Sequence, residues 1–206
     1  MLELIELLAV LSSAAFGVLL ARKKRLDFVG VFTVAFITAF GGGTLRDVLL
    51  DRQPLFWIKE AHYPVIVFGL ALFGAILPSF DGKLRRFLFI PDALGLGLFS
   101  IVGTIYALDN GTSWFIASLF GVMTGTFGGV AGDVICNEIP SLFRQSPLCA
   151  TCAFLGSWIY ILGTVTTFPE SALLIFSISV IVVIRLLAIR FNWVLPTTMP
   201  PEGNTS

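Results

Sequence analysis

Seven long apolar stretches divide the chain, and each is bounded by charged or turn-forming residues. Stretches of this length without polar alternation favour membrane-spanning helices over barrel strands, because in lipid a helix satisfies its own backbone hydrogen bonds. The predicted helices cover residues 2–21, 28–50, 61–79, 91–109, 113–136, 148–167 and 170–191. The pattern therefore predicts an all-α integral membrane protein with seven transmembrane helices.

The composition agrees with a chain that lies mostly in lipid. Hydrophobic residues make up 56% of the 206 positions and charged residues only 13%, about half the charged share of a soluble domain. The 13 basic and 13 acidic residues balance, so there is no positive field for nucleic acid. Three cysteines are too few for a disulfide framework. Glu3 and Glu6 stand where a signal peptide would be basic, so the first helix is expected to remain.

Basic residues are distributed unequally between the two predicted membrane faces. One face receives nine of them, Arg22, Lys23, Lys24, Arg25, Lys83, Arg85, Arg86, Arg144 and Arg190, and the other receives Arg52 and Lys59. Because basic loops stay in the cytoplasm, the N-terminus is expected outside and the C-terminus inside.

The sequence resembles itself when it is shifted by 86 positions. Six identities fall between residues 38 and 54, and they pair Thr38 with Thr124, Gly42 with Gly128, Gly43 with Gly129, Asp47 with Asp133, Val48 with Val134 and Pro54 with Pro140. Each copy holds three helices, an odd number, so the second copy enters the membrane from the opposite face. This is the inverted repeat of many transporter folds, in which the pathway lies where the copies meet.

The repeat divides the chain into four parts. Residues 1–80 are predicted to form the first three-helix repeat and residues 88–168 the second, inverted one. Residues 169–192 form a seventh helix outside the repeat, and residues 193–206 form a polar, disordered cytoplasmic tail.

Glycine runs interrupt the second and fifth predicted helices. The first run is Gly41, Gly42 and Gly43, and the second is Gly128 and Gly129. Glycine costs about 1 kcal/mol relative to alanine inside a helix, so we expect both helices to be broken at these runs. Carbonyl groups freed by a break must face protein or water, where they are good cation ligands.

A second interpretation of the glycines is close helix packing. Small residues recur every four positions, at Ala35, Ala39 and Gly43 and again at Gly121, Gly125 and Gly129. This spacing is typical of helices that approach closely in membranes. The charged residues after each run favour a break that lines a pathway, with packing on the other face.

Charged and hydroxyl side chains follow or flank the two glycine runs. Asp47 and Asp133 lie four residues past the runs, about 6 Å along an intact helix. Ionisable residues inside a membrane indicate function by default, so we expect both acids to attract cations at opposite mouths. Arg46 is expected to pair locally or to limit entry, with snorkelling or pairing at the interface as the alternative. Thr38, Thr44 and Thr124 could add hydroxyl oxygens.

At these residues the chain resembles the trimeric intracellular cation (TRIC) channels, and most of all their prokaryotic branch, which is also labelled as glycine transporters. The second motif follows an Asp-Ala-x-Gly-Leu segment, residues 92–96. The positions that match the two motifs are Gly41, Gly42, Gly43, Arg46, Asp47, Gly128, Gly129 and Asp133. The resemblance implies seven helices, kinks at the glycine runs, a homotrimer with one pore in each protomer, and conduction of monovalent cations, mainly K+. It also implies a location in a prokaryotic inner (plasma) membrane. Gly132 departs from the second motif, which usually has arginine there, so the inner mouth should be less positive than in relatives.

Several other residues that could carry chemistry are interpreted as structural. Cys149 and Cys152 form a C-x-x-C pair, but they begin an apolar helix and are expected to pack. Glu6 and Asp92 at the membrane edges are expected to be helix caps or interface anchors rather than pore acids. Arg185 is expected to snorkel to the cytoplasmic interface.

We therefore expect a passive, K+-permeable channel for monovalent cations, with a pore in each protomer between the two repeats. The candidate pathway residues are Thr38, Gly41, Gly42, Gly43, Thr44, Arg46, Asp47, Thr124, Gly128, Gly129 and Asp133. No catalytic group, metal site or cofactor is expected. The permeating ions are K+ or Na+, and the expected partners are two further copies of the chain and membrane lipid.

Two other functions remain open. A carrier for a small neutral amino acid such as glycine would use the same breaks, with a half-helix N-terminus holding the carboxylate. A purely structural membrane protein would conduct and transport nothing.

Overall fold

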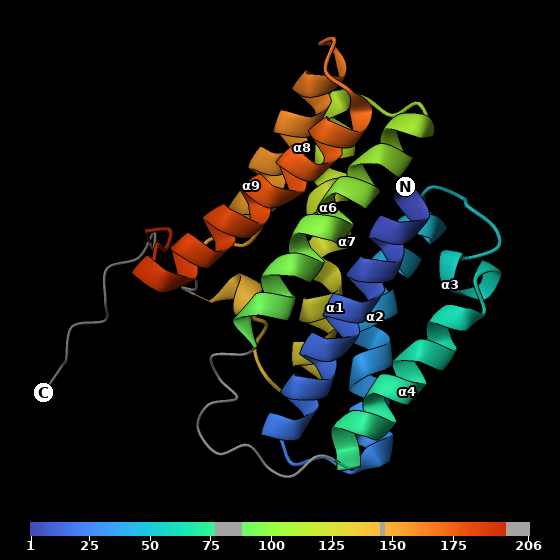
Figure 1. The fold of residues 1–206 in the computed structure, drawn as a ribbon. Coiled ribbons are helices and arrows are strands. Elements are labelled where there is room, and N and C mark those ends of the chain that lie inside the picture. Colours follow the sequence, from blue (N-terminus) through green and yellow to red (C-terminus); the bar gives the residue numbers. More distant parts are fainter. Residues whose placement is uncertain (77–87, 145–146, 197–206) are drawn as a thin grey trace, which may run out of the picture.

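The computed structural model describes residues 1–76, 88–144 and 147–196, and its regular elements are helices apart from one isolated bridge between Pro147 and Val194 (Figure 1). The helices are α1 Leu2–Lys23, α2 Phe28–Leu49, α3 Phe56–Lys59, α4 His62–Ile76, α6 Phe89–Asp109, α7 Trp114–Ile135, η1 Ser141–Phe143, α8 Ala150–Thr164 and α9 Glu170–Phe191. The all-helical prediction is confirmed.

Each of the seven predicted stretches contains one of the longer helices. Five of these, α1, α2, α6, α7 and α9, are by themselves long and apolar enough to cross a membrane. The described parts of α4 and α8 have 15 residues each, about 22 Å, which is shorter than the roughly 30 Å hydrocarbon core. Seven crossings therefore stay a prediction, and the predicted end of the third helix, residues 77–79, lies outside the described residues. Residues 197–206 of the predicted tail also lie outside the described residues.

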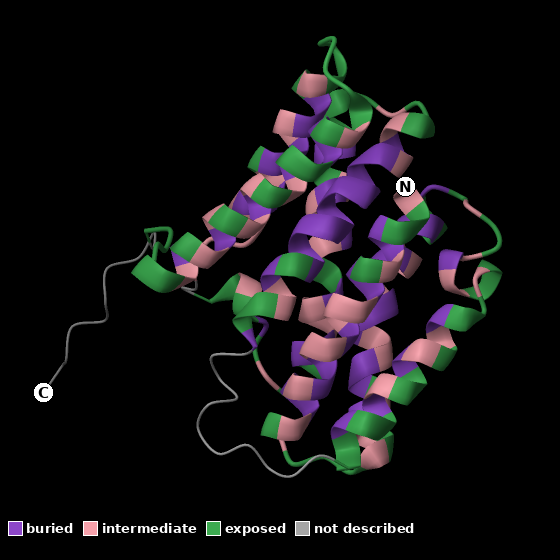
Figure 2. Ribbon diagram, in the orientation of Figure 1, coloured by how far each residue is buried: buried purple, intermediate pink, exposed green. Residues whose placement is uncertain are grey.

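The helices form two groups that meet along α1, α2, α6 and α7. Helix α4 packs against α1 and α2, α8 packs against α6 and α7, and α9 packs against α6 and α8 (Figure 1). Buried positions concentrate on the inward faces of the four central helices, whereas outward faces are exposed (Figure 2). Many of the exposed side chains are large and apolar, including Phe73, Ile76 and Phe176, as a lipid-facing surface requires.

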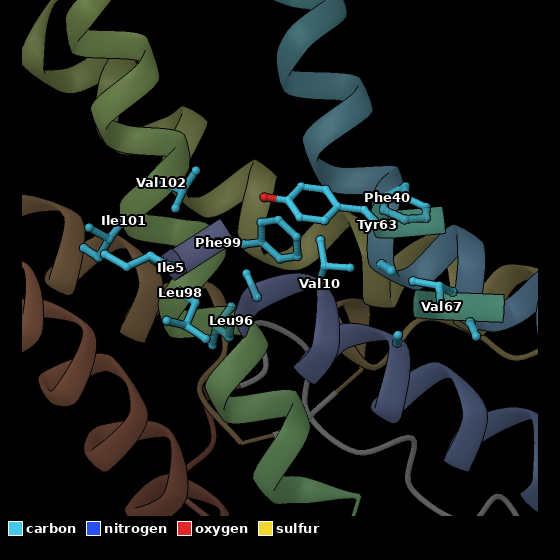
Figure 3. Packing of buried hydrophobic residues seen from close by; sticks show 14 of the residues in the cluster. Ile5, Val10, Phe40, Tyr63, Val67, Leu96, Leu98, Phe99, Ile101 and Val102 are labelled. Carbon is cyan, nitrogen blue, oxygen red and sulfur yellow. The ribbon is translucent and has the colours of Figure 1, made fainter. Parts of the chain in front are cut away.

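The apolar core between the groups combines small and aromatic residues. Val10, Phe40, Tyr63, Val67 and Phe99 lie together in its centre (Figure 3). Most of the alanines of α1 and α2 are fully buried, namely Ala9, Ala14, Ala21, Ala35 and Ala39, so the backbones can approach closely while the rings fill the remaining space.

The predicted breaks at the glycine runs are wrong. Helix α2 continues from Phe28 to Leu49, and α7 from Trp114 to Ile135, without an unwound turn. A Cβ atom on Gly42 would lie within 3.0 Å of the Thr124 carbonyl oxygen, and one on Gly128 within 3.0 Å of the Thr38 carbonyl oxygen. The glycines therefore serve the packing interpretation, because contact between two backbones offsets their poor helix propensity.

The ends of α2 and α7 repeat at the 86-residue spacing. Asp27 caps α2 by accepting from Gly30 N at 2.8 Å, and Ser113 caps α7 by accepting from Ile116 N at 3.4 Å. After the helices, Asp51 and Asn137 take left-handed backbone conformations with φ of 52° and 54°. The sequence similarity thus extends to the local structure that starts and stops both helices.

Candidate functional site

The α2–α7 crossing consists of Thr38 and Gly42 from α2 and Thr124 and Gly128 from α7. Each glycine faces the carbonyl oxygen of the opposite threonine, so the contact is reciprocal. The Thr38 hydroxyl donates within its own helix to Val34 O at 2.8 Å. The Thr124 hydroxyl oxygen is buried and has no hydrogen-bond partner within the described ranges. A buried polar atom of this kind indicates a place for water or a ligand.

A cavity of about 40 Å³, here called the central cavity, lies at this crossing. It is lined by all four crossing residues and extends past Gly129 to Asp92 and Ser141. One water needs about 10–15 Å³ of such volume, so the cavity has room for about three. The cavity therefore provides a small polar space between the two helix groups.

Gly41, Gly43 and Thr44 lie outside this lining. A Cβ on Gly43 would meet the ring of Phe56, and Thr44 Oγ1 accepts a hydrogen bond of 2.9 Å from Trp57 Nε1. Both contacts belong to the packing of α3 against α2. Gly41 faces Gly128 across the crossing, with 3.8 Å between an added Cβ and the Gly128 Cα. The structure thus separates the predicted pathway residues into a crossing group and an α3-facing group.

Arg46 and Asp47 lie in a buried group at the end of α2. The Arg46 guanidinium is fully buried, donates from Nε to Asp47 Oδ1 at 2.8 Å and contacts Glu6 Oε1 from Nη2 at 3.4 Å. Its Cζ lies 4.4 Å from the centre of the Tyr106 ring, within the range of a cation–π interaction. Arg46 therefore pairs locally and does not snorkel.

Two further groups complete what we call the Arg46 network, which consists of Glu6, Arg46, Asp47, Arg52 and Tyr106. The Tyr106 hydroxyl contacts Glu6 Oε2 at 3.3 Å, and the Arg52 Cζ lies 3.5 Å from the Tyr106 ring centre. Arg52 Nη1 lies 3.6 Å from Asp47 Oδ1. Two cations and two anions thus balance at this end of the α2–α7 pair, with the Arg52 side chain 35% exposed and the other three charged side chains buried.

Asp133 occupies the position equivalent to Asp47 at the opposite end. Its Oδ2 accepts from Ser141 N at 2.9 Å, as Asp47 Oδ2 accepts from Phe56 N at 2.8 Å. The preceding residue differs, because Gly132 stands where the first helix has Arg46. The duplicated backbone therefore holds both acids in the same way, but α7 supplies no guanidinium of its own.

Asp92 pairs with an arginine of α9 at this second end. Arg185 donates to Asp92 Oδ2 from Nη2 at 2.9 Å and from Nε at 3.3 Å. Its Nη1 donates to the carbonyl oxygens of Pro147 at 2.5 Å and Leu148 at 3.1 Å. We call Arg185, Asp92 and these two carbonyls the Arg185 clamp. The predicted snorkelling of Arg185 is wrong, because only 7% of the residue is exposed.

The interpretation of Glu6 and Asp92 as caps or interface anchors is also wrong. Neither α1 nor α6 has a side-chain cap, and each acid instead binds a buried arginine. The sequence held a signal for these pairs. Glu6 and Asp92 correspond at the 86-residue shift, and Arg46 and Arg185 lie within predicted apolar stretches, four or more residues from their ends, where a charge requires a counter-charge.

An exposed ion pair lies beyond the α7 end of the crossing. Glu138 binds Lys24 through one carboxylate oxygen and lies 3.5 Å from Arg144 Nη2 through the other. The Lys24 hydrogen bond and charge hold the pKa of Glu138 below its ordinary value. This pair connects the α1–α2 turn to the segment after α7.

Comparison with known proteins gives a consistent set of relatives. A family model described as "Glycine transporter" matches residues 3–79 and 89–164. A UPF0126 membrane protein of Vibrio cholerae is 34% identical over 198 residues, which cover 96% of this chain and 82% of the relative. The UPF0126 inner membrane protein YadS of Escherichia coli is 34% identical over 199 residues, which cover 94% of this chain and 96% of the relative.

Solved structures with the same fold are TRIC channels. A TRIC trimeric intracellular cation channel orthologue from Rhodobacter sphaeroides superimposes with a TM-score of 0.84 at 30% identity, over 93% of this chain and 98% of the other. A prokaryotic TRIC channel solved in 0.5 M KCl gives a TM-score of 0.85 at 30% identity, over 94% and 98% of the two chains.

Proposed function

The chain belongs to the TRIC channel family, which the matching family model describes as "Glycine transporter", and we propose that it is a membrane channel for monovalent cations, permeable to K+. The observation that carries the proposal is the central cavity, where two helix groups of a known channel fold enclose a small polar space. The solved relatives are named as cation channels.

The proposed pathway runs between residues 1–80 and 88–168, which act as inverted repeats. Support comes from the reciprocal contacts of Gly42 and Gly128 and from the equivalent ends of α2 and α7. Ions would pass the α2–α7 crossing, where threonine hydroxyls and carbonyl oxygens replace part of the hydration shell. Selectivity between K+ and Na+ would be modest, because the crossing offers no long series of carbonyl ligands.

The proposed gate is the Arg46 network. The central cavity holds about three waters, and the network occupies the end of α2 with two guanidinium groups and the Tyr106 ring. A cation arriving at this end meets Arg46, so conduction requires the guanidinium to move. Buried, fully packed networks switch between discrete arrangements rather than deform gradually, which is the behaviour of a gate.

The proposed assembly is a homotrimer in an inner membrane, with one pore in each protomer and bound lipid around it. The name of the Rhodobacter sphaeroides orthologue supports the trimer, and the name of YadS supports the inner membrane. The N-terminus would lie outside and the C-terminus in the cytoplasm, as the basic residues indicate. Native mass spectrometry in detergent would measure the number of copies.

Planar-bilayer recording tests conduction directly. We expect unitary current steps under a KCl gradient, with a reversal potential near that of K+ rather than Cl−. Thr124→Val keeps the shape of the side chain but removes the unpartnered hydroxyl, so unitary conductance should fall several-fold. Thr164→Val makes the same substitution at the end of α8, away from the cavity, and should match the parent. Equal conductance in Thr124→Val and the parent would contradict the proposed pathway.

A carrier for glycine is the second candidate, and the description of the family model favours it. Saturable uptake of labelled glycine into vesicles without current steps would support the carrier and overturn the channel. A structural protein would show neither activity, and Gly42→Ala and Asp133→Asn would then be silent in both assays.

A further inference from the structure

Arg185 connects three parts of the chain that are distant in sequence. It lies on α9, outside the repeated region, and binds Asp92 in the first turn of α6 together with the backbone just before α8. Leu148 is held from the other side too, because its N donates to Trp193 O at 3.0 Å. The segment from Pro147 to Cys149 is therefore fixed between α9 and the chain that follows it.

The Arg185 clamp borders the central cavity. Asp92 and Cys149 both contribute to the cavity lining, and Cys149 also lines a second cavity of about 220 Å³ between the loop and Leu195. The clamped segment thus forms a wall between the crossing and the space beyond it. Movement of this segment would change the width of the proposed pathway at the α7 end.

Asp92 and Glu6, which correspond at the 86-residue shift, have counter-ions from different parts of the chain. Glu6 is balanced by Arg46 from within the first repeat, whereas α7 carries Gly132 at the position of Arg46. Arg185 balances Asp92 and also binds the Pro147 and Leu148 carbonyls. The Asp92 carboxylate lines the central cavity, whereas Arg185 is not among the described residues that line it.

We propose that Arg185 is a positioning residue for conduction, which sets the effective charge of Asp92 and holds the Pro147–Cys149 segment as the wall of the pathway. In this role α9 supplies to the second repeat the arginine that Arg46 supplies to the first. The proposal rests on the proposed cation channel for its effect on current. The effect of Arg185 on the position of the Pro147–Cys149 segment does not depend on whether the protein conducts ions.

Current asymmetry tests the charge. In Arg185→Gln the Asp92 carboxylate loses its counter-ion, so cations entering from the α7 end should be concentrated. We expect about a two- to threefold larger current in that direction at low ionic strength, decreasing at high salt as screening increases. Arg190 is an exposed arginine on the same helix, so Arg190→Gln is the matched control. Its current–voltage curve should have the same shape as that of the parent.

The double variant Asp92→Asn/Arg185→Gln separates charge from structure. Both charges are absent, so the asymmetry should return to the parent value even if the wall is altered. Arg185→Lys retains the positive charge, so its current asymmetry should also equal that of the parent. Persistent asymmetry in the double variant, or no asymmetry in Arg185→Gln, would overturn the charge role.

Labelling of Cys149 tests the wall without any current. A charged maleimide forms a thioether with an accessible thiol, and we measure its rate by mass spectrometry on the detergent-solubilised oligomer. Release of the Pro147–Cys149 segment in Arg185→Gln should speed labelling at Cys149 by about tenfold relative to the parent and Arg190→Gln. Arg185→Lys should also label faster, because an ammonium lacks the planar fork that reaches Asp92 and both carbonyls together.

Three outcomes distinguish the inference from the proposed function. Parent protein without current, but with faster Cys149 labelling in both Arg185 variants, would reject the channel and retain the wall. Parent protein with current, but with parent-like labelling and asymmetry in every Arg185 variant, would reject the inference alone. If Arg185→Gln does not form the oligomer, the Arg185→Lys labelling rate decides, and a parent-like rate overturns the wall.

Discussion

The Arg46 network and the Arg185 clamp show two ways of placing an arginine beside an acid in a duplicated structure. At both ends an acid of the central helix, Asp47 or Asp133, accepts a backbone N–H, from Phe56 at one end and Ser141 at the other. At the first end a guanidinium comes from the neighbouring residue of the same helix and binds this acid together with Glu6. At the second end the guanidinium comes from α9 and binds Asp92 of α6 rather than Asp133.

This difference teaches that the repeated backbone fixes where the acids lie, while the origin of the cation decides how deeply each ion pair is buried. Arg46 is fully buried among aromatic rings and two carboxylates. Asp92 remains 24% exposed and lines the central cavity. A structure that repeats its helices is therefore asymmetrical in the burial of its charges.

The largest effect is expected when each end loses its arginine. Arg46→Met leaves Glu6 and Asp47 with reduced charge compensation in a dry site, which should lower the free energy of unfolding by about 3–5 kcal/mol. Arg185→Met should lower it less, because Asp92 retains contact with water. Thermal unfolding of the detergent-solubilised oligomer, followed by tryptophan fluorescence, measures both.

A triple variant serves as the control for the Arg46 network. Glu6→Gln/Arg46→Met/Asp47→Asn removes the acids' charges with the arginine, and it should recover a large part of the lost stability. If Arg46→Met proves no less stable than Arg185→Met, the two ends do not differ in the way described.

A smaller effect is expected at the α2–α7 crossing, which the two ends share. Gly42→Ala places a Cβ against the Thr124 carbonyl oxygen, a backbone atom that cannot rotate away. The two helices must separate, at a cost of about 1–3 kcal/mol, with a fall in unitary conductance. Gly128→Ala should behave alike, because its contact with Thr38 is equivalent.

Gly129→Ala is the matched control for this crossing. Nothing lies within 4 Å of an added Cβ at that position, so alanine should stabilise α7 by up to about 1 kcal/mol through helix propensity. Destabilisation of Gly129→Ala as large as that of Gly42→Ala would mean that the glycines act through helix flexibility rather than through contact.

The sequence predicted the helices well because their limits are set locally. The charged or turn-forming segments after residues 21, 50, 109 and 136 interrupt the apolar stretches, and the observed helices end within two residues of these positions. The 86-residue shift also predicted the equivalent positions of Thr38 and Thr124, which the structure brings together at the crossing.

Contacts between helices could not be read from the sequence in the same way. The propensity of Gly42 predicts a break, and only the facing Thr124 carbonyl makes an intact helix favourable. Arg46 and Glu6 are separated by 40 residues, and Arg185 and Asp92 by 93. The sequence indicates that such charges need partners, but the choice of partner depends on how helix faces are oriented in the folded chain.

The smallest effect concerns the surface pair that extends the second end. The hydrogen bond and charge of Lys24 lower the pKa of Glu138. A carboxyl with a lowered folded pKa stabilises the folded state above its unfolded pKa, and this contribution disappears as the pH falls through the folded pKa. The melting temperature of the parent should therefore exceed that of Glu138→Gln slightly at neutral pH, and the difference should shrink below about pH 4.5, the ordinary value.

The stability contribution of the Lys24–Glu138 pair should also depend on salt concentration, more strongly than that of the buried ion pairs. Glu138 and Lys24 are partly exposed, so added KCl should screen their attraction and reduce the difference between parent and Glu138→Gln. The loss in Arg46→Met should change less over the same range, because the side chains of Arg46, Glu6 and Asp47 are at most 6% exposed. A loss in Arg46→Met that salt reduces as strongly as the loss in Glu138→Gln would show that ions enter the network, and the contrast between a sealed end and an open one would fail.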